Sequence, residues 1–127
     1  MSLALASLLL AAVAPVPQPA APTLQAELTL GSAVREREIQ PLPETVSAGQ
    51  TVYAWSEIKG ATGDHVEHVW TCNGKELARH SLTLGNSKRW RTWSHQKVSA
   101  GSCHVEVLGP DGTRLQETTF EVGPAAR

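Results

Sequence analysis

The sequence has few aromatic residues, no excess of charge of either sign and no long hydrophobic run. One Tyr and one Phe accompany four Trp, and 11 basic against 12 acidic residues give a net charge of −1. This balance is typical of neither disordered nor nucleic-acid-binding chains. The basic run of Lys88, Arg89 and Arg91 with its tryptophans could contact single-stranded nucleic acid, but the overall charge argues against it, so we expect no nucleic-acid partner. The length of 127 residues leaves room for one domain of ordinary size.

The motifs of the common enzyme classes are also absent. The chain contains no G-x-S-x-G nucleophile elbow, no phosphate-binding glycine loop and no dinucleotide-binding fingerprint. Its histidines and cysteines invite a zinc site, but neither C-x-x-C nor H-E-x-x-H occurs. His65 and His68 also fall on opposite faces of an expected strand. We therefore predict a protein that is not an enzyme and that holds no metal and no cofactor.

The longest apolar segment, residues 3–14, contains only Leu, Ala, Val and one Ser. At ~1.5 Å per residue it is too short to cross a ~30 Å hydrocarbon core as a helix, so no stable membrane span is expected. It fits the h-region of a secretory signal peptide, although no Lys or Arg precedes it, and an uncleaved hydrophobic N-terminus is the alternative. We assign residues 1–22 to a signal peptide with a Pro/Ala-rich spacer, 23–123 to the domain and 124–127 to a tail. The protein is then periplasmic or secreted.

Cys72 and Cys103 are the two cysteines of the chain. An even number of cysteines in an exported protein favours a disulfide. Closing the loop between them would stabilise the fold by roughly 3.7 kcal/mol in the chain-entropy model. Two buried free thiols remain the alternative, because spacing alone does not show that the Cα atoms come close enough.

From residue 24 onward, short alternating segments are separated by turn-forming residues, which is typical of strands. Asn73-Gly74 predicts a type I′ hairpin turn, and the Pro-Asp-Gly run at 110–112 predicts a second hairpin. We therefore predict an all-β fold, an antiparallel immunoglobulin-like β-sandwich of about seven strands, with a small barrel as the competing architecture. The expected strands cover residues 24–30, 51–58, 65–72, 76–84, 89–95, 103–108 and 114–122.

Alternation also sorts the residues of two strands by face. His68, Trp70 and Cys72 share one face of the 65–72 strand, and Cys103 begins an apolar face on a later strand. A bridge between the two cysteines would turn both faces into the core. Trp70 is then a core residue, and a buried His68 would need hydrogen-bond partners for its ring nitrogens.

The tryptophan-bearing segments together resemble one bacterial family, domain of unknown function 2914. The resemblance rests on W-S at 55–56, H-V-W at 68–70, N-G-K at 73–75 and R-W-R-T-W-S at 89–94, and it extends over about residues 24–122. Members of the family usually follow a signal peptide or membrane segments, and the resemblance implies no activity, cofactor or ligand. The cysteines stand where aromatic residues are more usual, which implies that a disulfide replaces a packed aromatic pair.

Indole rings on a β-sheet face commonly stack on sugars or hold peptides. Alternation places Trp90 and Trp93 on opposite faces of their strand, so we expect one of them inside and assign Trp93 to the surface. Arg91, Trp93 and His95 then form an aromatic and cationic strip, with Trp55 as a neighbour. Such a strip suits carboxylate-bearing glycans or acidic peptide ends.

A structural interpretation of the strip competes with the binding interpretation. Arg91 would stack on Trp93 and pair with a local carboxylate such as Glu57, and together they would only seal the sheet face. On the binding interpretation, the protein is an exported, non-catalytic binding or interaction module of the bacterial envelope. Its partner would be an envelope glycan such as peptidoglycan or, alternatively, an envelope protein bound through exposed edge strands, with no small-molecule ligand.

Overall fold

The computed structural model describes residues 24–125, which form nine strands and no helix. The predicted signal peptide and the last two residues of the predicted tail lie outside the described residues. Within 24–125 there is accordingly no helix that could cross a bilayer. The strands are β1 (Gln25–Arg35), β2 (Glu38–Pro41), β3 (Val46–Ser47), β4 (Thr51–Thr62), β5 (His65–Cys72), β6 (Lys75–Thr83), β7 (Asn86–Lys97), β8 (Gly101–Leu108) and β9 (Arg114–Gly123).

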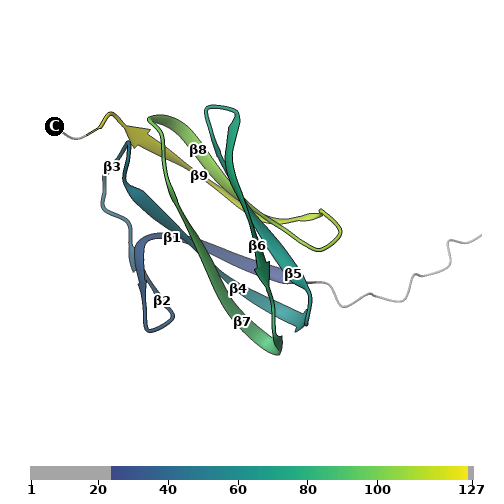
Figure 1. Cartoon of the computed structure of the whole chain (residues 1–127). Helices are drawn as coiled ribbons and strands as arrows, with labels where there is room; N and C mark the ends of the chain where they lie inside the picture. Colours follow the sequence, from purple (N-terminus) through teal and green to yellow (C-terminus); the bar gives the residue numbers. More distant parts are fainter. Residues whose placement is uncertain (1–23, 126–127) are drawn as a thin grey trace, which may run out of the picture.

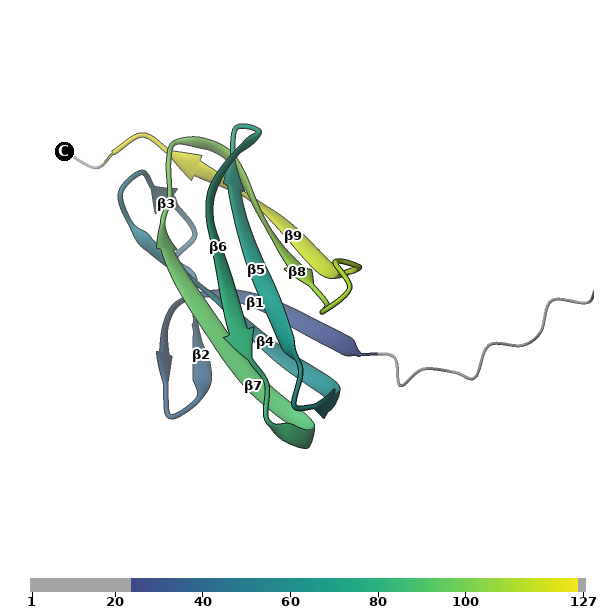
Figure 2. The ribbon, with the colours of Figure 1, turned by 45° about the vertical axis from the view of Figure 1, so that its right-hand side comes forward.

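The strands build two sheets that pack face to face (Figure 1). One sheet has the order β2-β1-β4-β7 and the other the order β3-β9-β8-β5-β6. All neighbours are antiparallel except the short β3, which pairs parallel with β9. Figure 2 shows β6 and β7 side by side at one edge of the sandwich, each ending its own sheet. The predicted all-β sandwich of immunoglobulin-like type is confirmed.

Two of the nine strands, β2 and β3, were missed by the prediction of about seven. The segment that holds them contains Pro41 and Pro43, which read as loop residues because proline cannot donate to a strand ladder. Pro41 is tolerated because it ends β2, and β2 lies at the edge of its sheet. β3 is only two residues long and leaves no periodic pattern to detect.

Both predicted hairpin turns are confirmed. Asn73 and Gly74, which join β5 to β6, have φ angles of 53° and 76°, as a type I′ turn requires. Gly112, between β8 and β9, has a φ of 83° and donates its N–H to the carbonyl of Gly109 at 3.0 Å. These turns fix the register beside them, and an irregularity shifts it farther along each pair, between Trp70 and Thr71 on β5 and between Val107 and Leu108 on β8.

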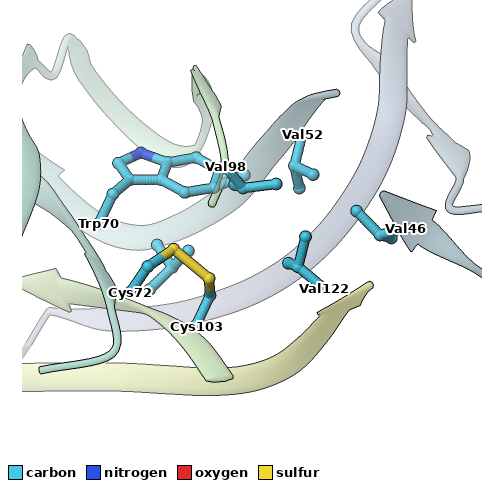
Figure 3. Close-up of a cluster of buried hydrophobic side chains, with 9 residues drawn as sticks. Val46, Val52, Trp70, Cys72, Val98, Cys103 and Val122 are labelled. Carbon is cyan, nitrogen blue, oxygen red and sulfur yellow. A yellow bond between two sulfur atoms is a disulfide. The ribbon is translucent and has the colours of Figure 1, made fainter. Parts of the chain in front are cut away.

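The largest core cluster surrounds Trp70 and a disulfide (Figure 3). Cys72 and Cys103 are bonded to one another, and they are direct cross-strand neighbours on β5 and β8. Both are buried, as is Trp70, which is 1% exposed. The predicted bridge and the predicted core position of Trp70 are thus present, and the bridge joins adjacent strands of one sheet rather than the two sheets.

A buried chain of hydrogen bonds joins the two sheets at His68. Its Nε2 lies 2.8 Å from the Ser56 hydroxyl on β4, and its Nδ1 lies 2.7 Å from the Ser94 hydroxyl on β7. Trp70 donates its indole N–H to the same Ser94 oxygen at 3.0 Å. Both ring nitrogens of His68 therefore have partners, as expected for a fully buried histidine.

The surroundings of His68 favour its neutral form. Burial lowers the pKa of His68 from 6.5 to about 4, and the adjacent His80 on β6 contributes further. In the neutral ring one nitrogen donates and the other accepts, which two hydroxyl partners can satisfy. No carboxylate hydrogen-bonds to the ring to stabilise the imidazolium.

We expect stability to fall on mild acidification because of His68. The unfolded state takes up a proton as the pH falls below 6.5 while the folded state resists until about 4, so stability is full above 6.5 and decreases between these values. The loss between pH 7.5 and 5 should be about 2 kcal/mol. Urea unfolding at both pH values, with His68→Gln as a non-titrating comparison, measures it. An equal loss in His68→Gln would show that another group is responsible.

The disulfide should contribute substantially to the free energy of unfolding. Removing it in a Cys72→Ala/Cys103→Ala variant releases the chain between β5 and β8 in the unfolded state and should cost roughly 2–4 kcal/mol. Denaturant titrations of the oxidised protein, the reduced protein and the variant test this expectation. If reduction left the unfolding midpoint unchanged, the bridge would have no stabilising role.

Candidate ligand-binding site

The outer face of the β2-β1-β4-β7 sheet collects the four residues that were predicted to form the strip. The register of β4 with β7 places Trp55 opposite Trp93 and Tyr53 opposite His95, while Glu57 faces Arg91. The residues between them on β4, such as Ala54 and Ile58, are fully buried in the core. Period-two alternation therefore points all four predicted side chains to the same outer surface.

Trp93 and Trp90 are both exposed, each at 36%. The expectation that one of them lies inside is wrong for Trp90. Trp90 is on the core-facing side of β7, but β7 is the last strand of its sheet, so no neighbouring strand covers the ring. The ring instead packs over Gly85, where even a Cβ atom would overlap it.

The hairpin of β1 and β2 approaches the same outer face. β1 has an irregularity between Gly31 and Ala33, and a Cβ on Gly31 would overlap Ile39 and the carbonyl of Gln40. Glycine therefore allows β2 to approach β1 closely at this point. The indole N–H of Trp55 donates to the carbonyl of Arg37 in the hairpin turn at 2.9 Å.

The turn itself adopts a conformation that its residues disfavour. Glu36 and Arg37 have φ angles of 51° and 66°, in the left-handed region that costs a non-glycine residue about 1 kcal/mol or more. The hydrogen bond from Trp55, which is only 8% exposed, holds the turn in this state. Trp55 thus positions the hairpin from beneath, and Arg37 is presented toward β7.

A cleft of about 510 Å³ lies between this turn and the free edge of β7. Arg91 and Trp93 of the predicted strip line it. His95 does not, and its ring lies against Tyr53 with centroids 5.1 Å apart. We call this hollow the β7 cleft; its lining residues are Arg37, Ser87, Arg89, Trp90, Arg91 and Trp93.

Carboxylates hold two of the three guanidinium groups of the β7 cleft in place. Glu57, largely buried, has an Oε1 that lies 3.3 Å from Nε of Arg89 and 3.9 Å from Nε of Arg91. Arg91 also bonds Glu38 at 3.0 Å. Pairing of Arg91 with Glu57, the structural alternative considered above, is therefore present.

The cleft nevertheless keeps positive charge that its own carboxylates do not balance. Three arginines face two glutamates, and Arg37 makes no ion pair with any residue in 24–125. The Arg89 side chain is 63% exposed. Cationic groups beside half-exposed indole rings can bind an anion that also carries a flat or apolar surface. Nowhere in the described part of the chain do three or more potential metal ligands gather.

Arg37 and Arg89 were not among the predicted site residues. Arg89 could have been found, because it lies two residues before Arg91 and alternation puts it on the same face. Arg37 could not, because its position depends on the close approach of β2 at Gly31 and on the long-range bond from Trp55.

These features define a two-sheet β-sandwich domain with a cationic, tryptophan-lined cleft at one sheet edge. Residues 63–122 match the model of a family described as "Protein of unknown function (DUF2914)", which confirms the resemblance found in the sequence over this segment. The matched part of the chain contains β5 to β9. Trp55 and Arg37 lie outside the matched segment.

Among curated proteins, none matches the chain. Solved structures with a similar arrangement include a β-glucosidase from Listeria innocua in complex with glucose, at 13% identity and a TM-score of 0.49, with 82% of this chain and 17% of that one covered. Another is the alkylpurine DNA glycosylase AlkC of Pseudomonas fluorescens, at 15% identity and a TM-score of 0.46, with 81% of this chain and 30% of that one covered. A CARDB domain from Pyrococcus furiosus has 13% identity and a TM-score of 0.41, with 81% of this chain and 98% of that one covered. The chain thus spans about a sixth of the glucosidase.

Replacing Trp55 with Phe should loosen the hairpin turn specifically. The ring still fills its place, but the hydrogen bond to the Arg37 carbonyl is lost, which should cost about 1 kcal/mol. Amide exchange measured by mass spectrometry should quicken at Glu36 and Arg37 relative to β5 and β8. Trp70→Phe is the matched control, because it removes an indole N–H from the core and not from the turn. Equal exchange at the turn in both variants would contradict the role assigned to Trp55.

Proposed function

We propose that the domain is an exported, non-catalytic binding module of the bacterial envelope that holds a carboxylate-bearing glycan such as peptidoglycan in the β7 cleft. The observation that carries the proposal is the cleft itself, where exposed faces of Trp90 and Trp93 lie beside three arginines. Indole rings stack on sugar rings, and guanidinium groups bind carboxylates with directed hydrogen bonds. Peptidoglycan offers both sugar rings and carboxylates.

Two further features support export and a binding role. The disulfide suits an oxidising compartment such as the periplasm or the cell exterior, in line with the predicted signal peptide. The buried carboxylate of the site, Glu57, is held by Arg89 and Arg91. In the proposed site, Glu57 sets the spacing of the guanidinium groups of Arg89 and Arg91.

Co-sedimentation of the oxidised domain with isolated peptidoglycan sacculi tests the proposal. The protein should pellet with sacculi at low and at physiological salt. Trp93→Ala should weaken pelleting about tenfold or more, since stacking on an aromatic ring and its burial contribute over 1 kcal/mol, while stability stays within about 1 kcal/mol.

The matched control is Arg114→Gln on β9, which removes an arginine paired with Glu117 on the other sheet. It should pellet like the unmodified protein, whereas Arg89→Gln should pellet less. Unchanged pelleting of Trp93→Ala, or an equal loss in Arg114→Gln, would reject the cleft as the glycan site.

A protein partner is the second candidate. The observation that favours it is that β7, which is 12 residues long, ends its sheet with no strand of residues 24–125 on its outer side. An edge strand of this length is a template for pairing with another chain.

A further inference from the structure

The backbone of β7 has free hydrogen-bonding groups at every second residue. The register with β4 is unbroken along β7, and Val98 N–H, just beyond β7, donates to the carbonyl of Gln50. Because bonded and non-bonded pairs alternate in an antiparallel ladder, the even-numbered residues of β7 bond to β4. The peptide groups of Arg91, Trp93 and His95 therefore point away from β4, toward the free edge.

Near the start of β7 the edge is already occupied. The Ser87 hydroxyl accepts from the Arg89 N–H at 3.2 Å and donates to the Arg89 carbonyl at 2.9 Å. These bonds agree with the outward direction of the odd-numbered peptide groups. They also leave the edge from Arg91 onward, which includes Trp93 and His95, as the part that can pair with a new strand.

The same three residues carry the side chains of the outer face. An added strand would therefore place alternate side chains beside Arg91, Trp93 and His95, with Arg89 close by. Across the whole of β7 there are two lysines and two arginines and no acidic residue, although the complete chain has a net charge of −1. The strand thus concentrates positive charge beside its free peptide groups.

Charge decides between possible occupants of the edge. Two copies of β7 paired antiparallel would set basic side chains against one another, which is destabilising. The other edge on this side of the sandwich, β6, carries an acidic residue of its own, because Glu76 pairs with Arg79 of the same strand. Arg89 and Arg91 of β7 are also paired, but with Glu57 and Glu38 of other strands, and β7 itself has no acidic residue. A strand with acidic residues on one face would therefore match β7 better than β6.

We propose that the free edge of β7 from Arg91 to His95 binds an extended acidic segment of another protein by strand addition. The backbone groups of β7 provide the hydrogen bonds, and Arg89 and Arg91 select for carboxylates on the outer face of the added strand. Trp93 contributes apolar contact beside them. This inference goes beyond glycan binding and does not depend on it.

His95 allows the backbone contribution to be tested apart from the β7 cleft. Its N–H points to the free edge and its ring does not line the cleft. His95→Pro removes that N–H without removing a bond to β4, and proline is tolerated on edge strands in this position. His95→Ala is the matched control, because it removes the same ring and keeps the N–H.

The probe is a fluorescein-labelled seven-residue peptide that alternates Glu and Thr, with a Gln/Thr peptide for comparison. Fluorescence anisotropy should show binding of the Glu peptide by the unmodified protein and by His95→Ala. His95→Pro should bind about tenfold more weakly, which corresponds to one hydrogen bond at the upper end of its usual net contribution. The unmodified protein should bind the Gln peptide about tenfold more weakly than the Glu peptide. Added salt should weaken its binding of the Glu peptide.

Several outcomes would overturn the inference. They are no binding of the Glu peptide, equal binding by His95→Pro and His95→Ala, and concentration-dependent self-association of the domain alone in light scattering. Should His95→Pro fail to fold, peptides N-methylated at alternate amides replace it. Methylation of one alternate set should abolish binding and methylation of the other should not, and equal binding of both would overturn strand addition.

Failure of this inference and failure of the glycan proposal are distinguishable. Sacculi pelleting depends on the cleft side chains and should be the same for His95→Pro and His95→Ala. If the protein pellets with sacculi but does not bind the acidic peptide, the result supports the glycan site alone. A protein that binds the peptide through its backbone but does not pellet supports strand addition alone.

Discussion

The hydrogen bonds of His68 are the interaction on which the rest of the structure depends. The ring sits on β5 in one sheet, and its two nitrogens reach hydroxyl groups on β4 and β7 in the other. Apolar packing brings two sheets together without fixing their relative position closely, whereas directional bonds from one ring to two strands do so. They set where β7 lies across the core, and therefore where its outer face and free edge lie. The position of the exposed side chains of β7 therefore depends on a buried polar side chain, His68.

The β7 cleft is assembled from parts that are each fixed by a different contact. Arg91 and Trp93 are placed by the ladder with β4, and Glu57 sets the spacing between Arg89 and Arg91. Arg37 arrives from the β1–β2 turn, where Trp55 holds two residues in the left-handed region. Because carboxylates hold Arg89 and Arg91, a ligand of the proposed kind would meet two charges already in position and would lose less side-chain entropy on binding.

Alternation and turn chemistry were sufficient to predict the core strands from the sequence. The buried faces of β5 and β8 and the turn at Asn73-Gly74 follow from local patterns. The Cys72–Cys103 bond was predicted instead from the even number of cysteines and the expected export, with two free thiols left as the alternative. Trp90 shows where such reasoning stops, because alternation gives the side of a strand but not whether another strand covers it. Arg37 shows a second limit, since its place depends on a bond between residues 18 apart in the sequence. The functional importance of the strip of Arg91, Trp93, His95 and Trp55 remains a prediction.

The position of the disulfide has a mechanical consequence. Cys72 and Cys103 close a covalent loop over the 31-residue separation between them, and both β6 and β7 lie inside this loop. Tension applied to the two ends of the folded chain crosses from β5 to β8 through the sulfur atoms and bypasses the residues in between. Under tension applied to its two ends, the domain would lose β1 or β9 from its sheets before any force extended β7 itself.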